Sequence, residues 1–176
     1  SSRSTDFMTP KSKTAKAFRD ATLDLARRHA FARPFVNSGR LSAPVAYLDS
    51  PLSSPSDDFA AGPAPGAVAI DAPVRVRNGE PWLLSHLGGA FSLLLFGAAA
   101  ARRKDFERRA RGGMRTLTIG CEDAMLIDEE GLATDRYGAK ESGVYLVRPD
   151  QHIAARWRDP APGAIESALA RAGGGA

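Results

Sequence analysis

The most continuous apolar run marks the centre of the predicted fold. Residues 91–96 hold five large apolar side chains and one polar side chain, Ser92. A strand with water on one face would alternate apolar and polar positions, so this run predicts a strand covered on both faces. Gly97 and four alanines follow, and residues 98–110 predict a helix with charge only in its second half. Strand, tight turn and helix are the start of a βαβ unit.

The residues after this unit predict a second strand, a short helix, a β-hairpin and a closing helix. Arg148, Pro149, Asp150 and Gln151 lie between two apolar runs. Proline at the second position and aspartate at the third are typical of a type I turn, so the two runs predict a β-hairpin. The predicted strands are residues 91–96, 114–119, 144–147 and 152–157, and the predicted helices after residue 110 are residues 129–137 and 162–172.

The segment before the central strand predicts shorter elements. Residues 74–76 alternate in polarity and predict a short strand, and Asn78-Gly79 predicts a tight turn. Residues 82–87 predict one apolar turn of helix, which Gly88 ends. The whole order places a parallel pair with a right-handed crossover beside two antiparallel strands. The predicted fold class is therefore α/β, a thioredoxin-like mixed sheet flanked by helices.

The first third of the chain predicts a separate helix and a linker. Phe18, Thr22 and Leu25 follow helical spacing from Ala15. Pro34 biases the residue before it away from helical angles, so this helix is predicted to fade by residue 32. Prolines and glycines crowd into residues 44–73, most densely at 56–66. The predicted organisation is an N-terminal helix and extended linker at residues 1–66 and an α/β domain at residues 67–176.

Size, cysteine content and hydropathy limit the class of protein. A chain of 176 residues with 43% hydrophobic residues can bury one core. Its single cysteine, Cys121, excludes an intramolecular disulfide and any CxxC pair, so a reducing, cytoplasmic location is expected. The longest apolar stretch has 12 residues, whereas a membrane span needs about 20. The chain starts Ser-Ser-Arg without methionine, which suggests a fragment or a processed chain.

The net charge of +4 arises from one segment, residues 102–115, with seven basic and two acidic side chains. Such a segment is typical of a patch for phosphate or nucleic acid, or of a solvated helix face whose C-terminal cations suit the helix dipole. Phe106 is the only aromatic residue among the arginines, and no recognition motif accompanies them, so the solvated face is favoured and nucleic acid is not an expected partner. The basic residues are Arg102, Arg103, Lys104, Arg108, Arg109, Arg111 and Arg115.

No catalytic constellation is predicted from the remaining chemistry. His29, His86 and His152 lie far apart in the sequence, so no metal site is expected. Cys121 precedes Glu122 and Asp123, whose charges oppose thiolate formation, so an inert cysteine is favoured over a thiol enzyme.

A structural role is favoured for three further groups. Asp150 is expected to bind its own backbone, and Arg148 to reach a carboxylate on a neighbouring helix, with a ligand role as the alternative. Trp82 and Trp157 are expected to be core or interface anchors, with stacking on an aromatic ligand as the alternative. The position where thioredoxin-like folds carry redox cysteines reads Gly97-Ala98-Ala99-Ala100, so that chemistry is predicted to be absent.

Several segments together resemble one known family, the FAD-dependent aromatic-ring hydroxylases, which are single-component flavoprotein monooxygenases. The resemblance runs over nearly the whole chain and concerns the C-terminal portion of these enzymes. Its most specific parts are the Trp-Leu-Leu segment and the hairpin. The matching residues are 4–12, 37–42, 82–89 (Trp-Leu-Leu-Ser-His-Leu-Gly-Gly), 137–139 and 145–157 (Tyr-Leu-Val-Arg-Pro-Asp-Gln-His-Ile-Ala-Ala-Arg-Trp).

The resemblance implies a non-catalytic part of a larger enzyme that uses NAD(P)H and O2. In that family an N-terminal portion binds FAD and substrate, and a thioredoxin-like domain without redox cysteines follows. The chain has no GxGxxG after a strand and no later glycine-aspartate flavin segment, so no catalytic or cofactor-binding residue carries over, and FAD is expected only in the missing N-terminal part. The expected partner is that flavin-binding portion, or a separate flavoprotein chain, and a homodimer is a further option. The alternative is a free-standing module that binds an anionic partner through residues 102–111.

Overall fold

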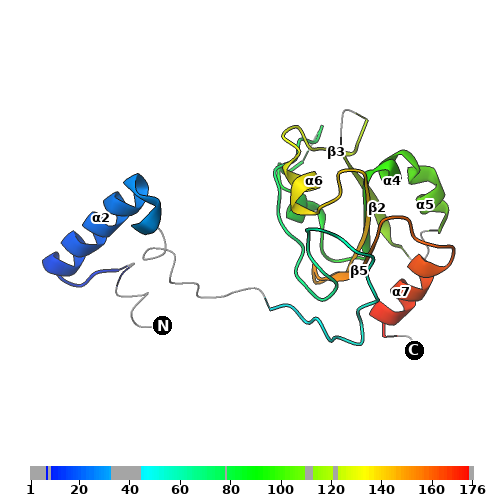
Figure 1. Ribbon diagram of the computed structural model, residues 1–176, viewed down its shortest axis with the longest axis horizontal. Helices are drawn as coiled ribbons and strands as arrows, with labels where there is room; N and C mark the ends of the chain where they lie inside the picture. Colours follow the sequence, from blue (N-terminus) through cyan, green and yellow to red (C-terminus); the bar gives the residue numbers. More distant parts are fainter. Residues whose placement is uncertain are drawn as a thin grey trace. The chain divides into compact units, whose positions relative to one another are not determined.

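The computed structural model describes residues 7, 9–32, 45–77, 79–109, 113–120 and 123–174. Contacts divide the chain into two compact units, Ser1–Pro44 and Val45–Ala176, and Figure 1 draws the described parts of each. Several residues named in the sequence predictions fall outside the described residues: residues 37–42 of the family resemblance, the turn residue Asn78, residues 110–112 within the basic segment, and Cys121 with Glu122.

The first unit holds the predicted N-terminal helix, α2 (Lys13–Arg28). The hydroxyl of Ser12 caps it by accepting a hydrogen bond from the Ala15 amide at 3.1 Å, and Arg27 and Arg28 stand in its last turn. A short 3₁₀ helix, η1 (Ala30–Ala32), follows it. No residue of α2 is buried, so the contacts of this unit leave its apolar positions uncovered.

The second unit is a five-stranded mixed sheet flanked by helices, which confirms the predicted α/β class. The order across the sheet is β3-β2-β1-β4-β5. β1 pairs parallel with β2 and antiparallel with β4, β2 pairs parallel with β3, and β4 pairs antiparallel with β5. The strands are β1 (Ser92–Gly97), β2 (Arg115–Gly120), β3 (Leu126–Ile127), β4 (Ser142–Val147) and β5 (Ile153–Trp157).

Both faces of β1 are buried, as its apolar run predicts. Leu93 and Leu95 face α4 (Ala98–Ala101), α5 (Arg103–Arg109) and α7 (Ala164–Ala172), whereas Leu94 and Phe96 face the layer that contains α6 (Leu132–Arg136). Figure 1 shows α4, α5 and α7 on one side of the sheet and α6 on the other. Strands β4 and β5 also place side chains in both cores, so the two cores lie on opposite faces of the sheet.

Three predictions of local structure were wrong in detail. Residues 98–109 form two helices instead of the one predicted for residues 98–110, because the backbone leaves helical geometry at Arg102 (φ −95°, ψ 18°). The guanidinium of Arg102 bonds to Asp159 at 2.7 Å, a partner 57 residues away that no local pattern reveals. Residues 74–76 form no strand and only isolated bridges, Pro73 to Trp82 and Arg75 to Ile127. The two-residue strand β3 was not predicted.

The segment that was predicted as a linker belongs to the second unit. We call residues 45–69 the strap. The amides of Ser54 and Gly66 donate to carbonyls of β5 at 2.8 and 2.7 Å, and Ala67 accepts from the Ile153 amide at 2.8 Å. Val68 adds an antiparallel bridge to His152. The division between the units therefore lies at residues 44–45, earlier than the boundary predicted at residue 66.

Arg156 of β5 and Arg158, just after β5, hold the strap from the side. Arg158 lies 3.8 Å from the ring centroid of Phe59, and Arg156 lies 4.7 Å from the same centroid. Arg156 also donates to the hydroxyl of Ser56 at 2.7 Å and to the carbonyl of Gly62 at 3.0 Å. Phe59 is buried and belongs to the core of this face. Glycines and prolines alone therefore do not identify a linker.

Candidate functional site

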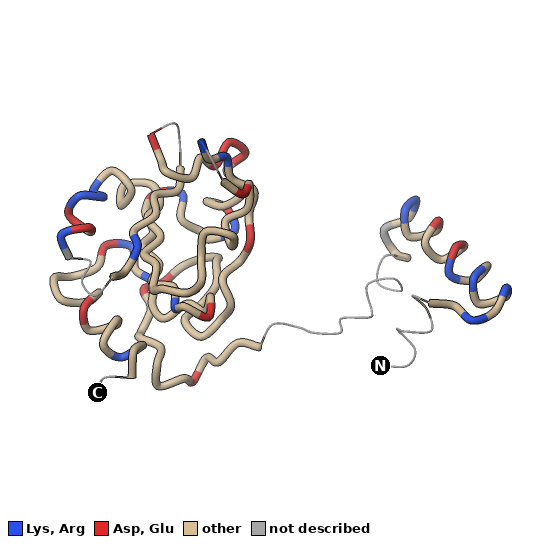
Figure 2. Tube along the Cα trace, turned by 180° about the vertical axis from the view of Figure 1, so that it is seen from behind, with Lys and Arg blue, Asp and Glu red and all other residues tan. Residues whose placement is uncertain are grey.

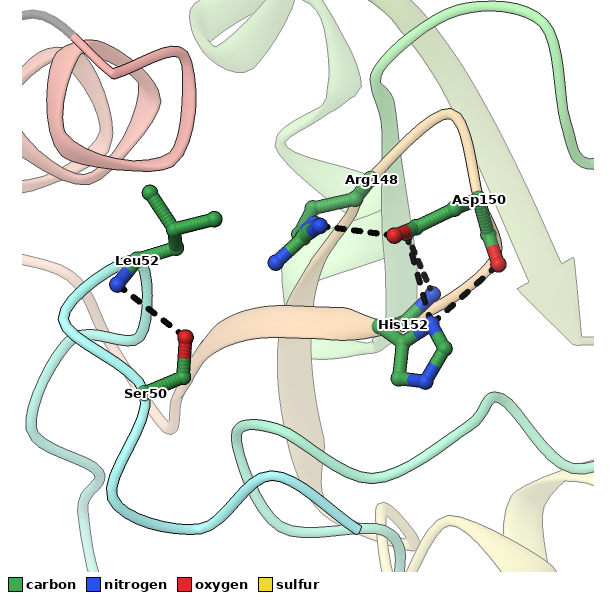
Figure 3. Close-up of polar contacts among 5 residues, drawn as sticks. All are labelled: Ser50, Leu52, Arg148, Asp150 and His152. Carbon is green, nitrogen blue, oxygen red and sulfur yellow. Dashed lines mark hydrogen bonds and ion pairs between the residues drawn. The ribbon is translucent and has the colours of Figure 1, made fainter. Parts of the chain in front are cut away.

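The turn between β4 and β5 holds the most connected polar group that the sequence singles out (Figure 3). Arg148 Nη2 lies 2.6 Å from Asp150 Oδ2, and the His152 amide donates to Asp150 Oδ1 at 3.2 Å. Burial alone would raise the pKa of Asp150, but the His152 amide and the Arg148 charge outweigh burial and lower it. Asp150 thus binds its own backbone, as predicted.

The predicted partner of Arg148 was wrong. Arg148 pairs with Asp150 within the same turn and not with a carboxylate on a helix. His152 also faces Asp150 through its ring, with Nδ1 at 3.4 Å from Oδ1. Figure 3 shows these three side chains together, beside the strap turn where the Ser50 hydroxyl accepts from the Leu52 amide at 3.3 Å. The charged groups of Arg148 and Asp150 already bind each other within the turn, so they are not free to bind a ligand.

The hairpin turn contacts the Trp-Leu-Leu segment, although 60 residues separate them in the sequence. The Gln151 side-chain amide donates to the carbonyls of Leu84 and Leu87 at 3.3 and 3.5 Å. The Gly89 amide donates to the Pro149 carbonyl at 3.1 Å. The 3₁₀ helix η2 (Leu83–His86) lies within that segment. The two most specific motifs of the chain therefore form one structural junction.

A second candidate site is the hollow at the carboxyl end of β1, where βαβ folds hold ligands. Its volume of about 760 Å³ is that of a small-molecule pocket. Glycines, alanines and two threonines make up much of its wall. The lining residues are Gly97, Ala100, Ala101, Arg103, Thr118, Ile119, Gly120, Asp123, Ala124, Thr134 and Lys140.

Four polar side chains that line this hollow already have partners. Arg103 pairs with Glu107 at 2.5 Å, and Lys140 pairs with Asp135 at 3.2 Å. The Thr118 hydroxyl accepts from the Met125 amide at 2.9 Å, and the Thr134 hydroxyl donates to Asp128 at 2.8 Å. The described lining thus includes no pair of nucleophile and base.

In a dinucleotide-binding site, the glycine after the first strand is essential, and Gly97 holds that position in this chain. A glycine after the first strand lets a pyrophosphate approach the backbone in such sites. In this chain a Cβ on Gly97 would lie 2.3 Å from the carbonyl oxygen of Glu141, and that oxygen accepts the Ala98 amide at 2.9 Å. The space at Gly97 is therefore filled by the chain's own loop before β4, and the residues do not fit a flavin pyrophosphate.

The histidines and tryptophans lie in ordinary packing environments. His86 Nε2 is 2.9 Å from the Glu80 carbonyl oxygen, and His29 lies in the first unit beside Phe31. Among the described residues, no cluster of three or more His, Cys, Asp or Glu side chains is arranged around a metal position. Trp157 is buried and is therefore a core residue, whereas Trp82 is 47% exposed. Trp82 thus remains a candidate for an interface.

The described part of the basic segment is largely neutralised. Arg102, Arg103 and Arg108 pair with Asp159, Glu107 and Asp105, in that order. Figure 2 shows acidic positions interspersed with basic ones over this unit. This arrangement favours the solvated helix face over a polyanion patch.

Sequence reasoning missed a buried aromatic cluster in which Phe59 of the strap packs against Tyr145 of β4, with ring centroids 5.5 Å apart. Tyr137 donates to the Ile70 carbonyl at 2.9 Å, and Tyr145 donates to the Tyr137 carbonyl. Burial strongly raises the pKa of Tyr137. Burial also raises the pKa of Tyr145 to about 12, although the charges of Arg156 and Arg158 lower it in part. Both phenols stay protonated as donors. No local pattern predicts this cluster, since its members meet only through the tertiary fold.

None of the helices in the described ranges is both long enough and apolar enough to cross a membrane. No family model matches the chain. Over 97 residues, or 54% of the chain, it is 34% identical to a 4-methyl-5-nitrocatechol 5-monooxygenase from Burkholderia sp, and it covers 18% of that protein.

Solved structures share the fold over more of the chain. The flavin-dependent monooxygenase PieE, in complex with FAD and substrate, matches 97% of the chain with a TM-score of 0.62 and 24% identity. The aklavinone-11 hydroxylase, in a complex with FAD and aklavinone, matches 73% with a TM-score of 0.56 and 25% identity. The chain covers 32% and 26% of those two structures, so it spans less than a third of each of these three relatives.

Proposed function

We propose that this chain, which matches one part of the FAD-dependent monooxygenases, is the non-catalytic C-terminal part of an aromatic hydroxylase. In this proposal it supports the flavin-binding part or holds subunits together, and the whole enzyme uses NAD(P)H and O2. The observation that carries the proposal is the coverage: the match spans most of this chain but only a small share of its flavoenzyme relatives.

The sheet supports the thioredoxin-like part of the proposal. Strands β2, β1, β4 and β5 stand in that order, with a parallel βαβ unit followed by an antiparallel hairpin and a closing helix. A thioredoxin-like core has this order, and the redox position after its first strand is occupied by Gly97 and Ala98. The fold thus supplies a scaffold, without the thiol chemistry.

The hollow at Gly97 supports a flavin site outside this chain. FAD supplies the redox chemistry in such enzymes, and its pyrophosphate needs an open glycine-rich turn at a helix N-terminus. The Glu141 carbonyl fills that place in this chain. We therefore propose that the flavin-binding part lies on polypeptide beyond these 176 residues and that this chain contributes stability and not reacting groups.

The test is to purify the chain alone and with the flavin-binding polypeptide encoded beside it. We expect the chain alone to be colourless and the two polypeptides to co-purify with FAD, while an unrelated flavoprotein is not captured. Stoichiometric flavin bound by the chain alone would contradict the proposal. So would the absence of any association with the flavin-binding polypeptide.

A further inference from the structure

Gln151 has a backbone conformation that is unusual for a residue with a side chain. Its φ is 65°, and every other positive φ among the residues that the structure describes belongs to a glycine. The Gln151 amide donates to the Arg148 carbonyl at 2.9 Å, and the Arg148 amide donates to the His152 carbonyl at 2.8 Å. A hairpin closed in this way takes a left-handed residue at its last turn position, where glycine is the ordinary choice. A side chain there lowers stability unless its contacts offset the unfavourable φ.

The contacts of this side chain lead to the Trp-Leu-Leu segment. The Gln151 Nε2 atom donates to the carbonyls of Leu84 and Leu87, at 3.3 and 3.5 Å. These carbonyls stand at the end of η2, where backbone acceptors commonly lack partners within the helix. A Cβ on Gly88 would lie 3.5 Å from the same nitrogen. One side chain thus spans from the hairpin turn to the end of η2.

Two glycines follow η2 at the point where Gln151 holds it. Gly88 and Gly89 have φ of 95° and 72°, and nothing lies within 4 Å of the Cβ position on Gly89. Residues at the end of an element can absorb changes in backbone angles, and glycine does so over the widest range. The Gly89 amide also donates to the Pro149 carbonyl at 3.1 Å. The hairpin turn therefore fastens both the end of η2 and the glycines that could serve as its hinge.

We propose that Gln151 is a latch, whose side-chain amide keeps residues 82–87 closed on the core, and that this segment opens about Gly88-Gly89 when the amide is lost. Opening would expose Leu83 and Leu87, which are buried, so the closed state stays favoured without the latch. The latch lowers the population of a local opening, and the rest of the sheet does not depend on it. The inference concerns this chain alone and is independent of the function proposed above.

The experiment compares Gln151→Glu and Gln151→Gly with the unaltered 176-residue chain. Glutamate keeps the size of the side chain and its left-handed backbone, but a carboxylate cannot donate to the two carbonyls. Glycine removes the amide and also the unfavourable φ. In both variants we expect the amides of Leu83, Leu84 and Leu87 to exchange hydrogen at least about tenfold faster. In Gln151→Gly the amides of β1 and β4 should keep their exchange rates.

Urea denaturation of the same two variants separates the latch from the backbone conformation. Both lack the donated bonds, but only Gln151→Glu retains the left-handed side-chain position, so its equilibrium constant for unfolding should be about fivefold larger or more. The glycine variant introduces no charge and serves as the control for the charge of the glutamate.

Three outcomes would overturn the latch. Unchanged exchange at the three leucine amides in both variants would show that the Gln151 side chain holds nothing closed. Faster exchange in Gln151→Glu alone would assign the effect to the new charge. In Gln151→Gly, exchange that accelerates equally in β1 and β4 would reveal a loss of global stability in place of a local opening.

Discussion

At the scale of single residues, Gly97 and Glu141 come together where the first strand ends. Gly97 has φ of 54° and ψ of −129°, a backbone conformation that side chains rarely adopt. The Glu141 carbonyl also stands where a Cβ would be. Two independent constraints therefore select glycine at this position.

Gly97→Ala should lower the free energy of unfolding by about 2–4 kcal/mol, since it adds a backbone clash to an unfavourable φ. Urea denaturation measures the change. Gly131→Ala is the matched control: Gly131 also has a positive φ, 68°, but nothing lies within 4 Å of its Cβ position. The control should lose only about 1 kcal/mol. Equal losses in the two variants would show that Glu141 does not fill the site.

Asp150→Asn should destabilise the chain at neutral pH and not in acid. The pKa of Asp150 is lowered in the folded state, while an unfolded aspartate titrates near about 3.9. Its charge therefore contributes stability above the unfolded value, and this contribution is lost as the pH falls through the folded value. Urea midpoints of the two proteins at a series of pH values should converge in acid. A constant difference across the series would assign the effect to packing.

At the scale of elements, α5 and the preceding Arg102 carry charge on which the alternative function depends. Ion pairs occupy Arg102, Arg103 and Arg108. These pairs are exposed, so each adds little to stability, about 0–1 kcal/mol. Their consequence is for binding, because a paired arginine presents a weaker field to a polyanion.

We expect the chain to leave a heparin column at low salt. Asp105→Asn with Glu107→Gln frees two arginines and should move elution to higher salt. Glu129→Gln with Asp135→Asn gives the same change in net charge elsewhere on the unit, because these residues pair with Arg75 and Lys140, and should move elution less. Strong, salt-sensitive retention of the unaltered chain would instead favour the anion-binding module.

The elements that the sequence predicts well are those with local causes. The residues at 91–96 and in the Arg-Pro-Asp-Gln turn are by themselves sufficient to predict a strand and a hairpin. No local pattern reveals the contact of Arg102 with Asp159 at the helix break, or the bridge from Arg75 to Ile127 of β3. The candidate site divides in the same way: the Asp150 turn follows from its residues, whereas the carbonyl above Gly97 comes from a loop 44 positions later.

At the scale of the whole molecule, the strap decides where the second unit begins. Arg156 reaches Ser56 across 100 residues of sequence, and Phe59 packs edge-on against Tyr145 with ring centroids 5.5 Å apart. The sequence predicts a linker there because linkers are typically rich in proline and glycine. The contacts that make it part of the core are visible only in three dimensions.

A chain shortened to residues 67–176 should therefore be less stable than one shortened to residues 45–176. Loss of Phe59 alone costs about 3–5 kcal/mol, which corresponds to a melting temperature lower by about 10 °C or more. Thermal denaturation followed by circular dichroism measures both proteins. Equal melting temperatures would support the boundary at residue 66.

The pairing of the strap with β5 also bears on solubility. β5 is the last strand in the order of the sheet, and an uncovered outer strand offers its amides and carbonyls as a template for another chain. Gly66, Ala67 and Ala69 occupy those groups at Ile153 and Gln151. Removal of the strap residues through Ala69 would thus open a site for edge-to-edge polymerisation.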